Sequence, residues 1–220
     1  MCFSATANFV GSGVLGAVGV LTLTRVKHRR ELLFASLPTL FAIHQFTEGF
    51  VWLGLDGYFS KQFTHNMGAA FVLYAQGLLP FIMPMSVMLF EQTRARRRAM
   101  MPLTILGGLL TLYMLWALTA YPLYVGVDRN SIVYVNQATN FTFVAVLYII
   151  ATCGSLFFSK RPVMVAFGGA NLAIVLVVAA VKRYAGTSVW CAYAAAASVI
   201  ILMYFWKTMG IRPFKYVEVL

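Results

Sequence analysis

The sequence predicts an all-α fold, a bundle of seven transmembrane helices with the N-terminus outside and the C-terminus in the cytoplasm. The composition, the lengths of the apolar runs and the placement of the basic residues lead to this prediction. Of 220 residues, 61% are hydrophobic and 10% are charged, whereas a soluble domain carries roughly a quarter of charged residues. Most of the surface must therefore face something other than water. No Pro-, Ser- or Gly-rich linker divides the chain, so we expect residues 1–220 to form a single integral membrane domain.

Seven apolar segments reach the length of about 20 residues that a helix needs to cross a hydrocarbon core about 30 Å thick. We expect spans over about residues 4–24, 32–55, 67–90, 100–124, 136–158, 162–181 and 188–206. The first segment is interpreted as a span rather than a cleaved signal peptide, because no basic residue precedes it and no A-x-A-like site ends it.

The basic residues alternate between the two sides that seven spans create. One side holds 13 of the 17 Lys and Arg residues, and the other side holds 4. Cytoplasmic connections carry the excess of Lys and Arg, so the richer side is predicted to be cytoplasmic. The clusters flank apolar runs rather than lining one face, so the net charge of +11 predicts a lipid bilayer as partner and no nucleic acid. The richer side holds Arg25, Lys27, Arg29, Arg30, Arg94, Arg96, Arg97, Arg98, Lys160, Arg161, Lys207, Arg212 and Lys215.

Polar side chains inside the spans gather toward the outer side. His44 and Glu48 of the second span are four residues apart and share a helical face. Gln45 flanks that face and Trp52 extends it outward. Ionisable groups within a span are costly and usually face the interior of the bundle. We therefore predict an outward-facing polar cavity with His44 and Glu48 at its floor. The other residues predicted to reach it, from their spans or from the connection between spans six and seven, are Ser4, Gln76, Asn140, Lys182 and Cys191.

Three functions are compatible with this pattern. The first, which we favour, is the binding or passage of a small solute or ion through the cavity. The second is an intramembrane enzyme that uses His44 and Glu48, with Cys2 or a metal ion. The third is a structural subunit of a membrane complex, in which His44, Gln45 and Glu48 form interhelical hydrogen bonds. The sequence contains no phosphate-binding Gly-rich loop, no G-x-S-x-G and no H-E-x-x-H motif.

Neither a metal centre nor a cofactor follows from the spacing of the residues. A metal site needs three or four ligands, and His44, Glu48, Cys2 and Cys191 would meet only if spans one, two and seven adjoin. A disulfide between Cys2 and Cys191 stays open, because both are predicted near the outer face. Catalytic residues, cofactors and the oligomeric state are left unassigned.

Small residues four apart predict where helices approach closely in a bilayer. Such pairs occur in spans one, six and seven, which we therefore expect to form a tight cluster. The pairs are Ser12/Gly16, Gly13/Ala17, Ala166/Ala170, Ala192/Ala196 and Ala194/Ser198.

Several motifs resemble an uncharacterised bacterial family of membrane proteins whose members begin MCFSATASF. Residues 1–9 read MCFSATANF, and the likeness continues through residues 44–53, HQFTEGFVWL, and residues 188–191, SVWC. It also covers Pro80, Pro84 and Glu91 with the Arg run that follows. Asn8 stands in place of the usual Ser, and Leu79 in place of a Trp. The resemblance implies a multi-pass protein of the bacterial inner (plasma) membrane and implies no activity.

Overall fold

The computed structural model describes residues 4–128, 131–139, 141–180 and 186–209, and for part of α8 and α9 it describes the backbone alone. A 3₁₀ turn at Arg29–Glu31 precedes α2, and a π-helical turn at Leu73–Leu78 joins α4 to α5 in one continuous helix. The helices and strands are α1 (Ala5–Leu23), α2 (Leu32–Ala35), α3 (Leu37–Leu55), α4 (Lys61–Val72), α5 (Leu79–Phe90), α6 (Arg94–Ala120), β1 (Leu123–Asp128), β2 (Ser131–Asn136), α7 (Thr142–Phe157), α8 (Pro162–Ala180) and α9 (Gly186–Met209).

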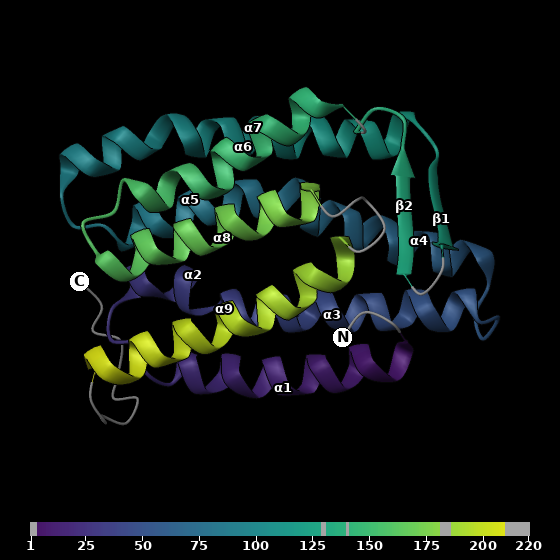
Figure 1. Cartoon of the computed structure of the whole chain (residues 1–220), viewed down its shortest axis with the longest axis horizontal. Helices are drawn as coiled ribbons and strands as arrows, with labels where there is room; N and C mark the ends of the chain where they lie inside the picture. Colours follow the sequence, from purple (N-terminus) through teal and green to yellow (C-terminus); the bar gives the residue numbers. More distant parts are fainter. Residues whose placement is uncertain (1–3, 129–130, 140, 181–185, 210–220) are drawn as a thin grey trace.

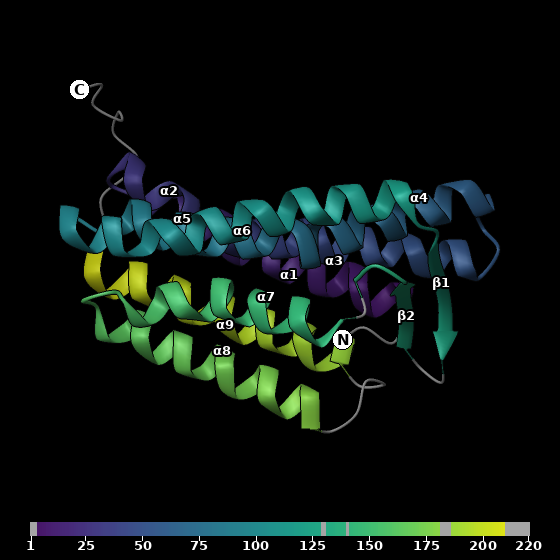
Figure 2. The same cartoon turned by 90° about the horizontal axis from the view of Figure 1, so that it is seen from above.

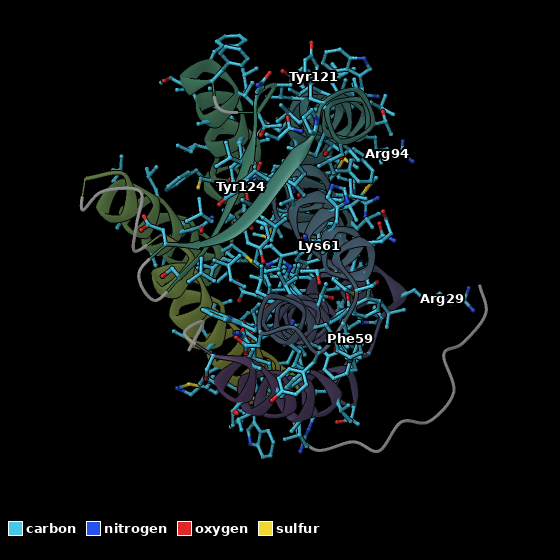
Figure 3. All side chains as sticks on the ribbon, turned by 90° about the vertical axis from the view of Figure 1, so that its right-hand side faces the viewer. Arg29, Phe59, Lys61, Arg94, Tyr121 and Tyr124 are labelled. Atoms are coloured by element: carbon cyan, nitrogen blue, oxygen red, sulfur yellow. The ribbon has the colours of Figure 1, made fainter. Side chains whose placement is uncertain are left out.

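The long helices lie side by side with their axes roughly parallel (Figures 1 and 2). Helices that follow one another in the chain contact each other, and α9 packs against α1, which closes the bundle into a ring (Figure 3). The β1–β2 hairpin lies across one end of this ring. The connections from α5 to α6 and from α7 to α8 lie at the opposite end (Figure 1).

Each of the seven predicted apolar segments coincides with a helical segment, so the prediction of a helical fold is confirmed. Within the described residues, three helices are long and apolar enough to cross a membrane, namely Ala5–Leu23, Lys61–Phe90 and Arg94–Ala120. Shorter apolar helices cover Thr142–Phe157, Met164–Ala173 and Ala194–Lys207. Seven membrane crossings and their orientation therefore stay a prediction.

The connection between α6 and α7 corrects the all-helical prediction. Strands β1 and β2 pair in an antiparallel hairpin, with Leu123 opposite Asn136 at its base. The predicted boundaries at residues 124 and 136 are wrong, because α6 ends at Ala120 and α7 begins at Thr142. The Asn136 side-chain amide donates to the carbonyls of Ala117 (3.1 Å) and Tyr121 (3.2 Å). The Ala117 carbonyl also accepts from the Tyr121 N–H, so the amide adds a second bond there, gives the carbonyl of the C-cap residue Tyr121 a partner and fixes the hairpin to α6.

The predicted cluster of spans one, six and seven is only partly right. Helix α9 packs against both α1 and α8, but the small face of α1 packs mainly on α3. A Cβ atom at Gly19 would lie 2.7 Å from the backbone nitrogen of Thr39, so only glycine allows this approach. The Ser12 hydroxyl donates to the Ala42 carbonyl at 2.9 Å. Ala196, which we expected inside the cluster, is exposed.

Aromatic side chains fill the core at the end of the bundle opposite the hairpin. The Phe34 ring lies 5.6 Å from that of Phe90, 6.4 Å from that of Phe167 and 6.5 Å from that of Phe205. All four rings are buried. The centre of this half of the core therefore consists of closely packed aromatic rings.

Candidate functional site

Helix α3 carries a line of buried polar side chains toward the hairpin. His44, Glu48 and Trp52 follow one another at intervals of four residues and are 5%, 0% and 7% exposed. This spacing places them on one face, which extends over about 12 Å at a rise of about 1.5 Å per residue. Pro38 lies in the first turn of α3. A backbone N–H group at this position would have no acceptor within the helix, so a proline there costs no helical hydrogen bond. The helix therefore runs uninterrupted through all three residues.

Aromatic rings enclose the inner part of this line. The His44 imidazole stacks on the Phe71 ring, with centroids 4.0 Å apart and planes 16° apart. The Tyr74 ring lies 4.6 Å from the imidazole. Phe71 in turn stacks on Tyr134 at 4.7 Å. The rings of α3, α4, the π-helical turn and β2 thus form one continuous group around His44.

The π-helical turn presents Tyr74 to the imidazole. Pro80 and Pro84 follow it and cannot donate backbone hydrogen bonds. Side chains from other helices donate hydrogen bonds to carbonyl groups of the turn. The Tyr148 hydroxyl donates to the Ala75 carbonyl at 2.9 Å, and the Thr111 hydroxyl donates to the Gly77 carbonyl at 2.8 Å. Single wide turns of this kind are frequent at functional sites.

The hairpin covers the outer part of the line. Ile132 of β2 packs in one buried cluster with Val51 and Trp52, and Tyr134 borders that cluster. A Cβ atom at Gly68 of α4 would lie 2.7 Å from a methyl carbon of Val125, so the absence of a side chain lets β1 lie directly on α4. Burial raises the pKa of the Tyr134 phenol well above its ordinary value, and the charge of the nearby Glu48 raises it further.

Five buried polar atoms of this group have no hydrogen-bond partner within the described part of the chain. A buried donor or acceptor without a partner costs about 1–3 kcal/mol. Most buried polar groups in proteins are paired, so such a concentration calls for water or a ligand. The atoms are His44 Nδ1 and Nε2, Trp52 Nε1, Tyr74 Oη and Tyr134 Oη.

The remaining predicted site residues lie in different surroundings. The Gln45 amide donates to the Asn8 side chain of α1 at 2.5 Å and therefore bridges two helices. Ser4 is exposed, and its hydroxyl accepts from the Ala7 N–H at 3.2 Å as the N-cap of α1. Gln76 is exposed within the π-helical turn. Two predicted residues, Asn140 and Lys182, lie outside the described residues, as does the side chain of Cys191.

A metal centre finds no support in the described part of the structure, where no three His, Cys, Asp or Glu side chains come together. The described free cysteine, Cys153, is buried in α7, where it accepts from the Asn171 amide at 3.3 Å. Cys2 lies outside the described residues, so its pairing with Cys191 stays a prediction.

A family model matches residues 1–214, nearly the whole chain. The chain belongs to DUF6629, a family of unknown function. This agrees with the resemblance to an uncharacterised family, although the description of DUF6629 does not state that its members are membrane proteins. No curated protein and no solved structure matches the chain significantly. For this member of DUF6629, function must therefore be argued from the geometry of the site.

Two residues of the site were not predicted from the sequence. Tyr134 lies in the predicted connection between the fourth and fifth spans and was not assigned to the site, but the hairpin brings its ring into the group around His44. Phe71 was treated as an ordinary apolar residue of a span, but it is the ring on which His44 stacks. The alternation of β-branched and aromatic residues over residues 123–128 and 131–135 was a usable signal for strands.

Proposed function

We propose that this protein is a multi-pass membrane protein whose seven helices cross the bilayer, and that it binds a small polar solute or ion beneath the hairpin. The N-terminus and the hairpin are on the outer side in this proposal, and the Arg-rich connections are in the cytoplasm. Binding takes place at the group around His44, Glu48, Trp52, Tyr74 and Tyr134.

Exposed apolar side chains support the insertion into a bilayer. On α1, Val10, Val14 and Leu21 are 63%, 57% and 45% exposed. In water such a helix face would be a liability, whereas in lipid it contacts acyl chains at no cost. The excess of Lys and Arg at the end opposite the hairpin supports the orientation.

The observation that carries the binding proposal is the set of five buried polar atoms without a partner. They come from four side chains on three separate segments, and all of these segments meet beneath the hairpin. A stable protein rarely tolerates several such atoms, since together they would offset a large part of a stability of about 5–15 kcal/mol. A solute or ion with several polar atoms would satisfy them.

The inner half of the core favours binding over passage. The Phe34, Phe90 and Phe205 rings lie in contact beyond His44, and all three are buried. A polar solute would lose its hydrogen bonds on crossing this apolar layer. The site is thus proposed as a pocket with access from the outer side only.

Tyrosine-to-phenylalanine variants test the proposal, because they remove a hydroxyl and keep the ring. In dialysed protein reconstituted in nanodiscs, Tyr134→Phe and Tyr74→Phe should raise the free energy of unfolding by about 1 kcal/mol each, since a hydroxyl without a partner is lost. Tyr148→Phe is the matched control and should lower it by about 1 kcal/mol, because this hydroxyl donates to Ala75. Thermal melts measure all three.

The same melts, run with a panel of monovalent cations, amino acids and sugars, test binding. At least one solute should raise the melting temperature of the parent, and Tyr134→Phe should reduce that shift. If no solute shifts the parent, and Tyr134→Phe destabilises the protein as much as Tyr148→Phe does, the polar groups are interhelical hydrogen bonds and the structural-subunit alternative is preferred.

A further inference from the structure

We propose a second binding site, for the headgroup of an anionic phospholipid, on the surface that α1 and α9 share at the Arg-rich end of the bundle. The guanidinium of Arg25 binds the headgroup, and the ring of Trp206 holds that guanidinium in position. Exposed apolar side chains of the two helices contact the acyl chains. This site is separate from the group beneath the hairpin and rests on the membrane insertion proposed above, not on solute binding.

A direct contact between Arg25 and Trp206 joins the two helices on this surface. The Cζ atom of Arg25, just after the end of α1, lies 4.0 Å from the centroid of the Trp206 ring in the last turns of α9. The two helices also pack against each other, and both end at the side of the bundle opposite the hairpin (Figure 1). Trp206 is 48% exposed and Arg25 is half-buried, so the pair lies at the surface rather than in the core.

The contact with Trp206 leaves the hydrogen-bond donors of Arg25 available. A guanidinium that lies over an aromatic ring is attracted through its face, whereas its five N–H groups lie in its plane. Among the residues that the structure describes, none accepts a hydrogen bond from these groups. Two phosphate oxygens match the paired N–H groups of a guanidinium. The pair therefore presents a positioned cation with open donors.

Positive charge predominates around the pair. Lys27 follows Arg25 by two residues, Lys207 follows Trp206 directly, and both lysine side chains are exposed. Glu31 is the described carboxylate closest to Arg25 in the sequence, but it is 3% exposed. One of its oxygens accepts hydrogen bonds from two backbone N–H groups of its own connection, each at 3.1 Å. This carboxylate is thus occupied below the surface, and the surface around the pair stays positive.

An exposed apolar stripe leads away from the pair along each helix. The α1 stripe precedes Arg25 by four and eleven residues, and the α9 stripe precedes Trp206 by three and seven residues. Each stripe therefore shares a helical face with its own member of the pair. At a rise of about 1.5 Å per residue the stripes extend over about 16 Å and about 10 Å, similar to one leaflet of about 15 Å. The residues, with their exposed fractions, are Leu21 (45%) and Val14 (57%) on α1, and Met203 (49%) and Val199 (46%) on α9.

The ligand that covers this surface must carry negative charge for Arg25 and acyl chains for the two stripes. Nucleic acid or an acidic protein would meet the charge and leave the apolar side chains uncovered. A zwitterionic lipid would bring its own positive charge close to Arg25 and the two lysines. An anionic phospholipid meets both requirements.

The experiment compares phosphatidylglycerol with phosphatidylcholine. The full chain is purified with an equal mixture of the two lipids, and native mass spectrometry counts the lipids that stay bound. The parent should retain phosphatidylglycerol preferentially. Arg25→Gln should reduce the preference about fivefold, the change that corresponds to about 1 kcal/mol per basic residue near an anionic surface. Circular dichroism checks that helix content is unchanged.

Two substitutions at Trp206 test whether its ring positions Arg25. Trp206→Leu keeps an apolar side chain but removes the ring, so it should reduce the preference about two- to fivefold, the contribution of an exposed cation–π pair. Trp206→Phe keeps an aromatic face for the guanidinium and should retain most of the preference. A loss in Trp206→Phe as large as that in Trp206→Leu would overturn the role of the ring.

The matched control is Arg94→Gln, which removes an exposed basic residue from the same end of the bundle, on α6. Figure 3 shows Arg94 pointing away from the bundle, so this variant should leave the preference unchanged. Equal retention of both lipids by the parent would overturn the proposal. A loss with Arg94→Gln equal to that with Arg25→Gln would overturn it too, because the preference would then reflect the overall charge of this end.

Further outcomes separate a lipid from its headgroup and this site from the other proposals. Full displacement of phosphatidylglycerol by an equal concentration of inorganic phosphate would overturn the proposal, because the site would then bind phosphate without acyl chains. A chain that fails to float with vesicles of either lipid would overturn this proposal and the membrane topology together. Lipid preference without any response to solutes would support this proposal and refute solute binding alone.

Discussion

The two ends of the bundle bury polar groups in opposite ways. At the Arg-rich end, the buried carboxylates of Glu31 and Glu91 accept hydrogen bonds from backbone N–H groups of the connections that they hold. At the hairpin end, the polar atoms of His44, Trp52 and Tyr134 are equally buried but have no partner within the described residues. The hydrogen bonds of the first arrangement are enough to explain why these carboxylates are buried, because they hold the connections in place.

The polar groups at the hairpin end have no such protein partners, and we propose that this difference distinguishes structural polar groups from ligand-binding ones in the same fold. A buried group that is fully paired stabilises one conformation. A buried group that is left open lowers stability and is retained where something else binds to it. The contrast between the two ends can be tested directly.

The largest effect concerns which sides of the membrane the two ends face. In a variant without native cysteines, Gln62→Cys at the hairpin end and Ala95→Cys at the start of α6 should react with an impermeant maleimide from opposite sides of sealed vesicles. Both positions are exposed, so access depends on topology alone. The expected result is all-or-none, and labelling of both from one side would exclude the seven-span orientation.

The Arg-rich end should lose stability when a paired carboxylate is removed. Glu91→Ala leaves the Lys160 N–H and the Ser159 hydroxyl without their acceptor, and we expect a loss of about 2–3 kcal/mol in the free energy of unfolding. Denaturant titration of protein in nanodiscs measures it. Gln92→Ala is the control, because Gln92 is adjacent and exposed. A Glu91→Ala variant as stable as this control would remove the distinction between the two ends.

The hairpin end should lose stability in alkali through Tyr134. Its pKa is raised in the folded state, so above the ordinary phenol pKa of about 10 the unfolded chain releases a proton that the folded chain keeps. Stability from this group is therefore complete below pH 10 and falls as the pH rises further, by on the order of 1 kcal/mol for each pH unit above it. Melts between pH 8 and 11 should show a steeper fall for the parent than for Tyr134→Phe. Parallel curves would mean that the phenol is exposed to water.

The helices could be predicted from sequence because apolar runs of sufficient length leave few alternatives. The hairpin could not be predicted in the same way. In a chain that is 61% hydrophobic, residues 121–124 and 136–141 were assigned to the neighbouring helices, and residues 125–135 were predicted as a connection without strands. The hairpin is held at this boundary by Asn136, whose amide donates to the carbonyls of Ala117 and Tyr121 at the end of α6, and this contact depends on tertiary structure.

The site was partly predictable for a similar reason. The spacing of His44, Glu48 and Trp52 along one helix places them on a common face. The residues that contact this face from other segments were harder to predict. The π-helical turn adds a residue to one turn, so the residues that follow it point in a different direction than they would in a regular α-helix. Gln76 was predicted to line the site, but it is exposed, whereas the Tyr74 ring lies 4.6 Å from the imidazole. Tyr134 was missed together with its strand.

The order of the elements along the chain has a consequence for the biogenesis of the protein. Helix α3 is synthesised long before β2, so in the topology proposed above Glu48 would enter the bilayer before the hairpin exists. Until the hairpin has formed, His44 and Trp52 would lack Tyr134 and Ile132 as their neighbours. Closure of the site would therefore be a late step of assembly, and a nascent chain released after α6 would contain Glu48 without the hairpin.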